Sequence, residues 1–153
     1  MMDEGLFPRG PDEAALLLWM QRYGDDVLRL CAVCLGDAAS ARRATCRVFV
    51  QAARTCKAGT ADMYAQLLRL AVGQLTKQLG PIRWRAAGRS PHDPALFDAL
   101  MALSPRDRAA VVLCCDLGLP PEQAAFALHM RTHALRRRVR NLCARLGVRQ
   151  NVP

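Results

Sequence analysis

The segment from Ser104 to Leu146, SPRDRAAVVLCCDLGLPPEQAAFALHMRTHALRRRVRNLCARL, limits the possible folds of this chain more than any other stretch. Ser104 is a favourable N-cap, Pro105 suits the first helical position, and Asp107 places a negative charge beside the positive end of a helix. Gly118 is the residue type expected just past a helix C-terminus. The pattern predicts a helix that begins at Ser104 and ends before Gly118, with apolar residues at helical spacing: Ala110, Val111, Leu113, Cys114 and Leu117.

Two more helices are predicted after Gly118. Pro120-Pro121-Glu122 marks a second helix start, and the small apolar residues that follow allow another helix to approach closely. A break near His129-Met130-Arg131 precedes a last helix that Gly147 would end. The inward positions of this last helix are Leu135, Val139, Leu142, Cys143 and Leu146. This succession is typical of a helix-turn-helix that docks on DNA.

Positive charge is concentrated in the same segment. From Gln123 to the C-terminus the sequence has no Asp or Glu, and seven arginines lie there: Arg131, Arg136, Arg137, Arg138, Arg140, Arg145 and Arg149. Arginines without nearby carboxylates favour a polyanion as partner. When such arginines bind the phosphates of a nucleic acid, the counterions condensed on it are released, and this release favours binding. A solvated basic face is the alternative interpretation of such a run. Since the run follows a helix-turn-helix pattern, we favour nucleic acid.

The composition sets the outer limits. With 153 residues, of which 52% are hydrophobic, the chain can bury one moderate core or two small ones. The net charge of +9 and the pI near 9.9 favour an anionic partner. No apolar run approaches the roughly 18 residues that cross a bilayer, and the N-terminus begins acidic. We therefore expect a soluble, cytoplasmic protein without membrane insertion.

The cysteines and histidines favour packing over metal or redox chemistry. The chain has seven cysteines, scattered through apolar positions as is typical of a reducing compartment. Cys31 and Cys34 have CxxC spacing, so metal binding and redox chemistry stay open, but both residues fall on an apolar helical stripe. His129 and His133 have the spacing of a zinc pair, yet the predicted turn separates them. We expect no metal, no cofactor and, without a nucleophile-base pair or a phosphate loop, no enzyme.

The first half of the chain is also predicted to be helical. Helical spacing of apolar residues predicts helices over 14–35, 41–57 and 61–78, the first interrupted at Tyr23-Gly24. Asp37 or Ser40 would cap the second helix, and Pro81 would end the third. Strand patterns of useful length are absent. We predict an all-α fold of two small helical bundles, at residues 12–86 and 95–150, joined by a short linker at 87–94, with the helix-turn-helix in the second bundle.

Two helical bundles in this order resemble the bacterial sigma factor family, in its small extracytoplasmic-function (ECF) group. The segment YGDDVLRLCAVCLGDAASARRATCRVFVQAAR, from Tyr23 to Arg54, is similar without a gap to conserved region two, with its Leu-Gly-Asp turn and Val-Phe helix. The segment YAQLLRLAVGQLTKQLGPIRWR resembles the next helix, which meets the minus-ten promoter element. The last third resembles region four, which reads the minus-thirty-five element through its last helix. The resemblance covers roughly Ala14 to Leu146 and implies a transcription initiation factor that directs RNA polymerase to specific promoters.

The resemblance implies DNA contacts from two places. The residues that would contact double-stranded promoter DNA around the last helix are Arg131, Thr132, His133, Arg136, Arg137, Arg138 and Arg140. For His133, packing against the turn is an equal alternative to base reading. The residues that would lie near the melted element, at the end of the third helix, are Lys77, Arg83, Trp84 and Arg85.

One surface departs from the family pattern. After the Leu-Gly-Asp turn the family usually has an acidic strip that grips a basic coiled coil of core RNA polymerase. Here the expected partner-binding residues are Arg42, Arg43, Arg47, Val48 and Gln51. Arginines would repel a basic surface, and the linker, counted as about ten residues from Arg85 to Pro94, reaches at most roughly 35 Å. The alternative function is therefore a sigma-like regulatory protein with altered or lost core-polymerase binding. It would act through protein partners, as a decoy for an anti-sigma factor or as a co-regulator of another sigma factor.

Overall fold

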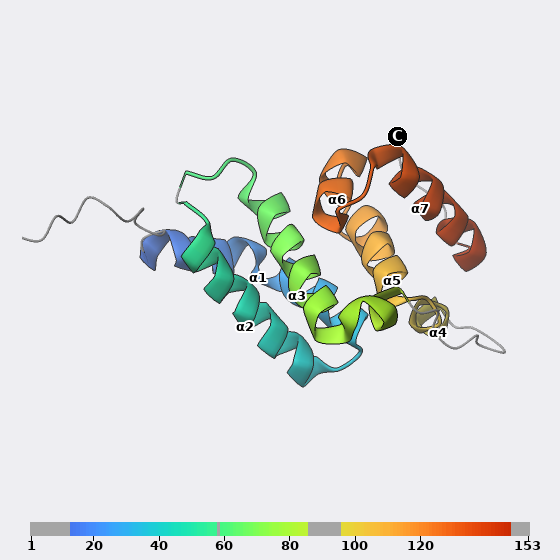
Figure 1. Cartoon of the computed structure of the whole chain (residues 1–153), viewed down its shortest axis with the longest axis horizontal. Helices are drawn as coiled ribbons and strands as arrows, with labels where there is room; N and C mark the ends of the chain where they lie inside the picture. The colour runs from blue at the N-terminus through green and yellow to red at the C-terminus, as the bar shows by residue number, and fades with distance from the viewer. Residues whose placement is uncertain (1–12, 58, 86–95, 148–153) are drawn as a thin grey trace, which may run out of the picture.

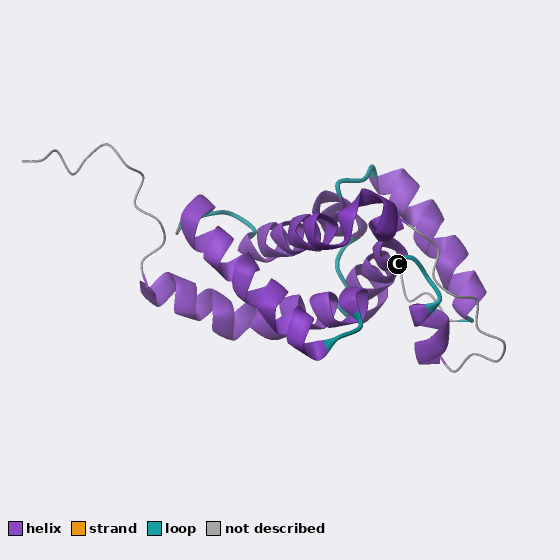
Figure 2. Cartoon of the chain, turned by 60° about the horizontal axis from the view of Figure 1, so that its bottom comes forward, coloured by secondary structure: helices purple, strands orange, loops and turns teal. Residues whose placement is uncertain are grey.

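Helices make up all the regular structure in the part of the chain that the computed structural model describes, residues 13–57, 59–85 and 96–147 (Figures 1 and 2). No strand occurs in these ranges, so the all-α prediction is confirmed for them. None of the described helices combines the length and apolarity needed to cross a membrane. In chain order the elements are α1 (Glu13–Leu35), α2 (Ala38–Thr55), α3 (Met63–Arg85), α4 (Leu96–Met101), α5 (Pro105–Val111), a π-helical turn η1 (Val112–Asp116), α6 (Pro121–Leu128) and α7 (Thr132–Leu146).

The capping residues and terminal glycines predicted from the sequence lie at the ends of the observed helices. The carboxylate of Asp37 caps α2 and the hydroxyl of Ser104 caps α5, each accepting a backbone N–H three residues later, at 2.8 and 3.1 Å. Gly118 and Gly147 follow their helices with φ of 65° and 67°, the left-handed conformation that glycine adopts without strain. Local sequence chemistry therefore determines these ends.

Two helices differ from the sequence prediction. α1 is continuous through Tyr23 and Gly24, where an interruption was expected. α3 continues beyond the expected end near residue 78 to Arg85, but Gly80 interrupts it with φ 77° and ψ 157°. Pro81 then stands in the first position of a second helical segment, where its missing N–H costs nothing. Pro81 therefore restarts the helix in a new direction instead of ending it.

The first three helices pack around a core of small and branched side chains. α2 turns its buried stripe, which includes Ala44, Val48 and Ala52, toward α1 and α3. The rings of Tyr23 and Tyr64 stack with centroids 5.1 Å apart, and the Tyr64 hydroxyl donates to the carboxylate of Asp26 at 2.6 Å. These contacts fix α3 along α1.

The two halves of the chain also pack against each other. α5 contacts both α1 and α3, and α6 lies along α3, as Figure 1 shows. The buried side chains of both halves belong to one continuous apolar cluster. The expected linker at 87–94 lies outside the described residues, and the described helices do not divide into two separate cores.

Arg108 of α5 joins the halves at the C-terminal end of α1. Its Nη2 donates to the carbonyl oxygen of Cys34 at 2.8 Å, and its Nη1 donates to the carbonyl oxygen of Met101 at 3.3 Å. Carbonyls in the last turn of a helix have no partner within it, and a cation there also interacts favourably with the helix dipole. Burial lowers the pKa of the Arg108 guanidinium from its ordinary value, but arginine stays charged at neutral pH.

Most of the thiols are enclosed. Cys31, Cys34 and Cys143 are buried and Cys114 is partly buried, as expected for core packing. Burial raises the pKa of Cys31 and of Cys114 to about 11, and it raises that of Cys34 as well. The Sγ atoms of Cys115 and Cys143 lie 3.4 Å apart as free thiols, and burial followed by this contact raises the pKa of Cys115 to about 12.

We predict that Arg108→Ala lowers the free energy of unfolding by about 2 kcal/mol, because it removes two charge-assisted hydrogen bonds and leaves the Cys34 carbonyl without a partner. Urea unfolding followed by circular dichroism measures the change. The control is Arg137→Ala, which removes the same charge from an exposed position and should stay within about 0.5 kcal/mol of wild type. Equal stability of the two variants would contradict the role given to Arg108.

We predict slow alkylation of the enclosed thiols, with a rate that rises with pH. A thiolate is the reacting species, and each unit by which the pKa exceeds the pH lowers its fraction about tenfold. Alkylation of Cys31 and Cys114 should therefore accelerate about tenfold per unit between about pH 8 and pH 10. Mass spectrometry of iodoacetamide time courses resolves each site, with the exposed Cys46 as the fast internal reference. The expectation fails if Cys31 reacts as fast as Cys46.

Candidate nucleic-acid interface

α6 and α7 are joined by a tight turn at His129. His129 adopts the left-handed conformation, with φ 53° and ψ 44°, in the position where glycine is commonest. The Met130 N–H donates to the carbonyl of Ala125 at 2.9 Å, which closes the end of α6. α7 then begins at Thr132, whose side chain is half-buried. The turn therefore fixes where α7 leaves α6.

α7 lies at the outer edge of the molecule and has one buried and one exposed face (Figures 1 and 2). Its buried residues pack on α5 and α6: Leu135, Val139, Leu142 and Cys143. Since successive residues are about 100° apart on a helix, the opposite face is centred near residue 137. Its exposed residues are His133, Arg137, Arg140, Asn141 and Ala144. We call these five residues the outward face of α7.

The arginines at the two sides of α7 are held by carboxylates of the neighbouring helices. Arg136 pairs with Glu122 of α6 at 3.1 Å, and Arg138 pairs with Asp107 of α5. By contrast, Arg137 and Arg140 have no ion pair with any residue that the structure describes. The intramolecular pairs therefore leave the outward face with uncompensated positive charge.

Asn141 is a member of this face that the sequence analysis missed. It is exposed and lies one turn after Arg137 and two turns after His133. The side-chain amide of asparagine can donate to and accept from one adenine edge, which makes it suited to base reading. Counting helical positions from His133 would have identified it.

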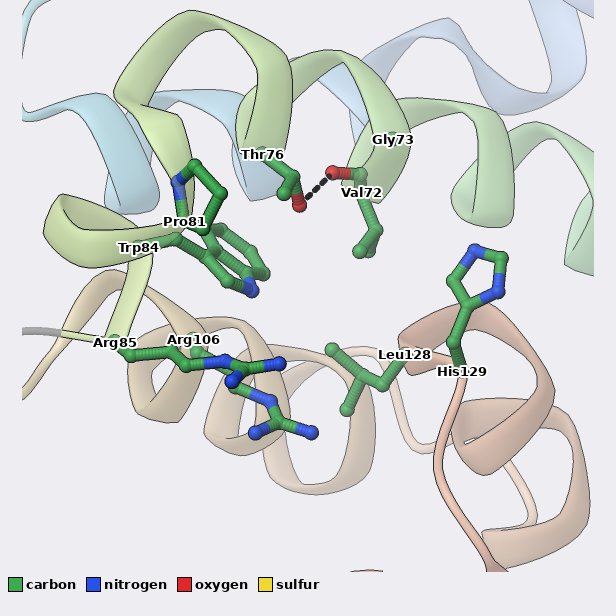
Figure 3. Close-up of a pocket in the computed structure, with 9 residues that line it drawn as sticks. All are labelled: Val72, Gly73, Thr76, Pro81, Trp84, Arg85, Arg106, Leu128 and His129. Carbon is green, nitrogen blue, oxygen red and sulfur yellow. Dashed lines mark hydrogen bonds between the residues drawn. The ribbon is translucent and has the colours of Figure 1, made fainter.

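The residues predicted near the melted element all lie on α3, but they differ in exposure. Lys77, Arg83 and Arg85 are exposed near the end of α3, on a different element from the outward face of α7. Trp84 differs from these three, since only 5% of its surface is exposed. After the change of direction at Gly80, the indole points toward α5 and α6 and lines a hollow there instead of the outer surface (Figure 3).

The residues predicted for partner binding on α2 are partly exposed and partly buried. Arg42, Arg43 and Arg47 are exposed, whereas Val48 is completely buried. Gln51 is half-buried, and its side-chain oxygen accepts from Nε2 of Gln74 at 2.8 Å. Three exposed residues that the sequence analysis did not assign share the helix face with Arg43 and Arg47: Cys46, Val50 and Arg54. We call Arg43, Cys46, Arg47, Val50 and Arg54 the basic face of α2.

Comparison with known proteins does not assign a family. A scan against models of known protein families finds no match, and a search of curated proteins finds no similar sequence. The resemblance to sigma factors therefore stays a prediction.

Proposed function

We propose that this chain is a DNA-binding transcription initiation factor of the sigma type, directing RNA polymerase to specific promoters. In the proposal α6, the turn at His129 and α7 form a helix-turn-helix, with α7 as the recognition helix. α1 to α3 correspond to region two of the family, and α4 to α7 correspond to region four. The proposal assigns no catalytic residue and no cofactor.

The observation that carries the proposal is the outward face of α7. Arg137 and Arg140 lie on it without carboxylate partners among the described residues, beside His133 and Asn141. The sequence contains no Asp or Glu from Gln123 to its end that could neutralise them. A cationic helix edge gains free energy by replacing the counterions of DNA, and the mixed polar side chains can read base edges in the major groove.

The arrangement of α3 implies a second, more open state of the protein under this proposal. Trp84 and Arg85, at the end of α3, line a hollow between this helix and the helices α5 and α6 (Figure 3), with Trp84 buried and Arg85 exposed at its edge. A role near melted promoter DNA requires these residues to separate from α5 and α6. We propose that polymerase or promoter binding supplies the free energy for this separation.

The basic face of α2 favours a second candidate function. A sigma factor of ordinary type would meet the basic coiled coil of the polymerase with carboxylates, whereas this face carries Arg43, Arg47 and Arg54. Like charges across a close interface cost several kcal/mol. The alternative is therefore a sigma-like regulator that binds an acidic partner through α2, such as an anti-sigma factor or another sigma factor.

We predict that Arg137→Ala and Arg140→Ala each remove one phosphate contact. Each substitution should therefore reduce the slope of log affinity for DNA against log salt concentration by about one unit. Fluorescence anisotropy with labelled duplex DNA over a salt series measures the slope. The matched control is Arg22→Ala, which removes the same charge from the exposed surface of α1 and should leave the slope unchanged.

Asn141→Ala separates base reading from charge in the same assay. It changes no charge, so the salt slope should stay that of wild type, while affinity for a selected site falls by about 1–3 kcal/mol and affinity for random DNA does not. If wild type binds duplex DNA no better than Arg137→Ala does at low salt, α7 is not a DNA-binding helix and the second candidate becomes the first.

If the basic face of α2 governs binding, as in the second candidate function, the wild-type chain should bind core RNA polymerase weakly. Replacing Arg42, Arg43 and Arg47 with glutamate should then strengthen binding, because attraction replaces repulsion. A pull-down with purified core polymerase measures the effect. The control replaces Arg22 with glutamate, a charge reversal on another helix. Tight wild-type binding that the triple glutamate variant abolishes would exclude the decoy function and indicate an acidic polymerase surface opposite α2.

A further inference from the structure

A hollow of about 310 Å³ lies where the end of α3 meets α5 and α6, and we call this interface the seam (Figure 3). Val72, Pro81, Trp84 and Leu128 supply an apolar wall. The volume is at the lower end of the roughly 300–1,000 Å³ typical of small-molecule sites. The seam is therefore large enough for an organic molecule of about mononucleotide size.

Two guanidinium groups point into this hollow from opposite halves of the chain. Arg85 comes from the end of α3 and Arg106 from the first turn of α5, and their side chains extend next to each other below Trp84 in Figure 3. Neither forms an ion pair or a hydrogen bond with any described residue. Burial first, and then the positive charges of Arg138 and Arg85, lower the pKa of Arg106. Asp107 acts in the opposite direction and raises this pKa, but it is the smallest of these causes, so repulsion between Arg85 and Arg106 is only partly offset.

A second hollow of about 160 Å³ continues the first along α3. The two share Gly73 and His129, and the second adds the cations Arg69 and Lys77. Among the residues that the structure describes, no Asp or Glu lines either hollow, although carboxylates hold the neighbouring arginines at the sides of α7. A concave surface whose described lining has several cations, an apolar wall and no carboxylate matches a ligand that is organic at one end and anionic at the other.

We infer that the seam is a binding site for a small phosphorylated ligand of nucleotide type, with its phosphates between Arg85 and Arg106 and its organic group against the wall formed by Val72, Pro81 and Leu128. Planar guanidinium groups bind phosphate oxygens in pairs, and two of them can share a diphosphate. His129 at the opposite side of the hollow limits the length of the organic group (Figure 3).

Binding would join the two halves. The phosphates would bridge α3 and α5 and replace the repulsion between Arg85 and Arg106 with attraction, so the closed arrangement that buries Trp84 would become more stable. This regulatory consequence rests on the proposed function, in which Trp84 must leave the seam to act at the promoter. Binding itself does not depend on that function, and it can be measured without DNA or polymerase.

The test is isothermal titration calorimetry of the full chain at moderate salt with ADP, GDP, CDP, UDP, inorganic pyrophosphate and adenosine. We expect one nucleoside diphosphate to bind saturably at one site and more tightly than pyrophosphate, and adenosine to bind at least tenfold more weakly. Arg106→Gln should weaken binding at least tenfold. Gly73→Leu should do the same sterically, because a Cβ at Gly73 meets no atom within 4 Å and the added side chain would occupy the hollow. Arg137→Gln, an equal charge change on the outward face of α7, should leave affinity within twofold.

Three outcomes would overturn the inference. The first is the absence of saturable binding for every probe at millimolar concentration, with folded protein confirmed by circular dichroism. The second is binding that Arg137→Gln weakens as much as Arg106→Gln does, which would mean nonspecific attraction to a basic protein. The third is a single-stranded oligonucleotide that binds more tightly than any diphosphate and loses affinity in both seam variants, which would make the seam a nucleic-acid groove. None of these outcomes bears on DNA binding by α7, so the proposed function can fail or succeed separately.

Discussion

The packing of the two halves depends on the charged hydrogen bonds of Arg108 at the end of α1. The apolar cluster alone gives little orientation, because small side chains such as Ala109 and Ala110 can pack in several ways at similar free energy. A half-buried guanidinium tolerates far fewer arrangements, since its donors must meet the carbonyls of Cys34 and Met101. Once α5 is fixed against α1 in this way, α6 and α7 follow, because both pack on α5.

The arginines of α7 differ in whether a carboxylate of a neighbouring helix pairs with them. Arg136 and Arg138, at the two sides of the helix, pair with Glu122 and Asp107 and stabilise its packing. The arginines of the outward face point into solvent. A count of arginines in the sequence treats them all alike. In the fold they divide into a structural pair and an unpaired group, and only the unpaired group offers its full charge to a polyanion.

Local signals in the sequence predicted most of the secondary structure but not how the halves meet. Caps such as Asp37 and Ser104 act through adjacent backbone N–H groups, so a short segment is enough to recognise them. Val48 was assigned to the partner surface from a family motif, whereas the apolar period of α2 indicates the buried position that the structure gives it. Trp84 could not be placed, since the period of α3 does not continue through Gly80 and the helices that cover the indole lie far away in sequence.

The left-handed conformation of Gly80 separates two parts of α3 that have different neighbours. Before it, Leu68 and Leu75 belong to the core with α1 and α2, and Val72 belongs to both the core and the seam. After it, Trp84 and Arg85 line the seam. Any other residue at position 80 would have a strained backbone. The direction of the second helical segment therefore depends on this glycine. Substitutions at Trp84 and Arg85 can therefore change one side of the seam during evolution, while Val72 and the helical stretch before Gly80 keep their sequence and their place in the core.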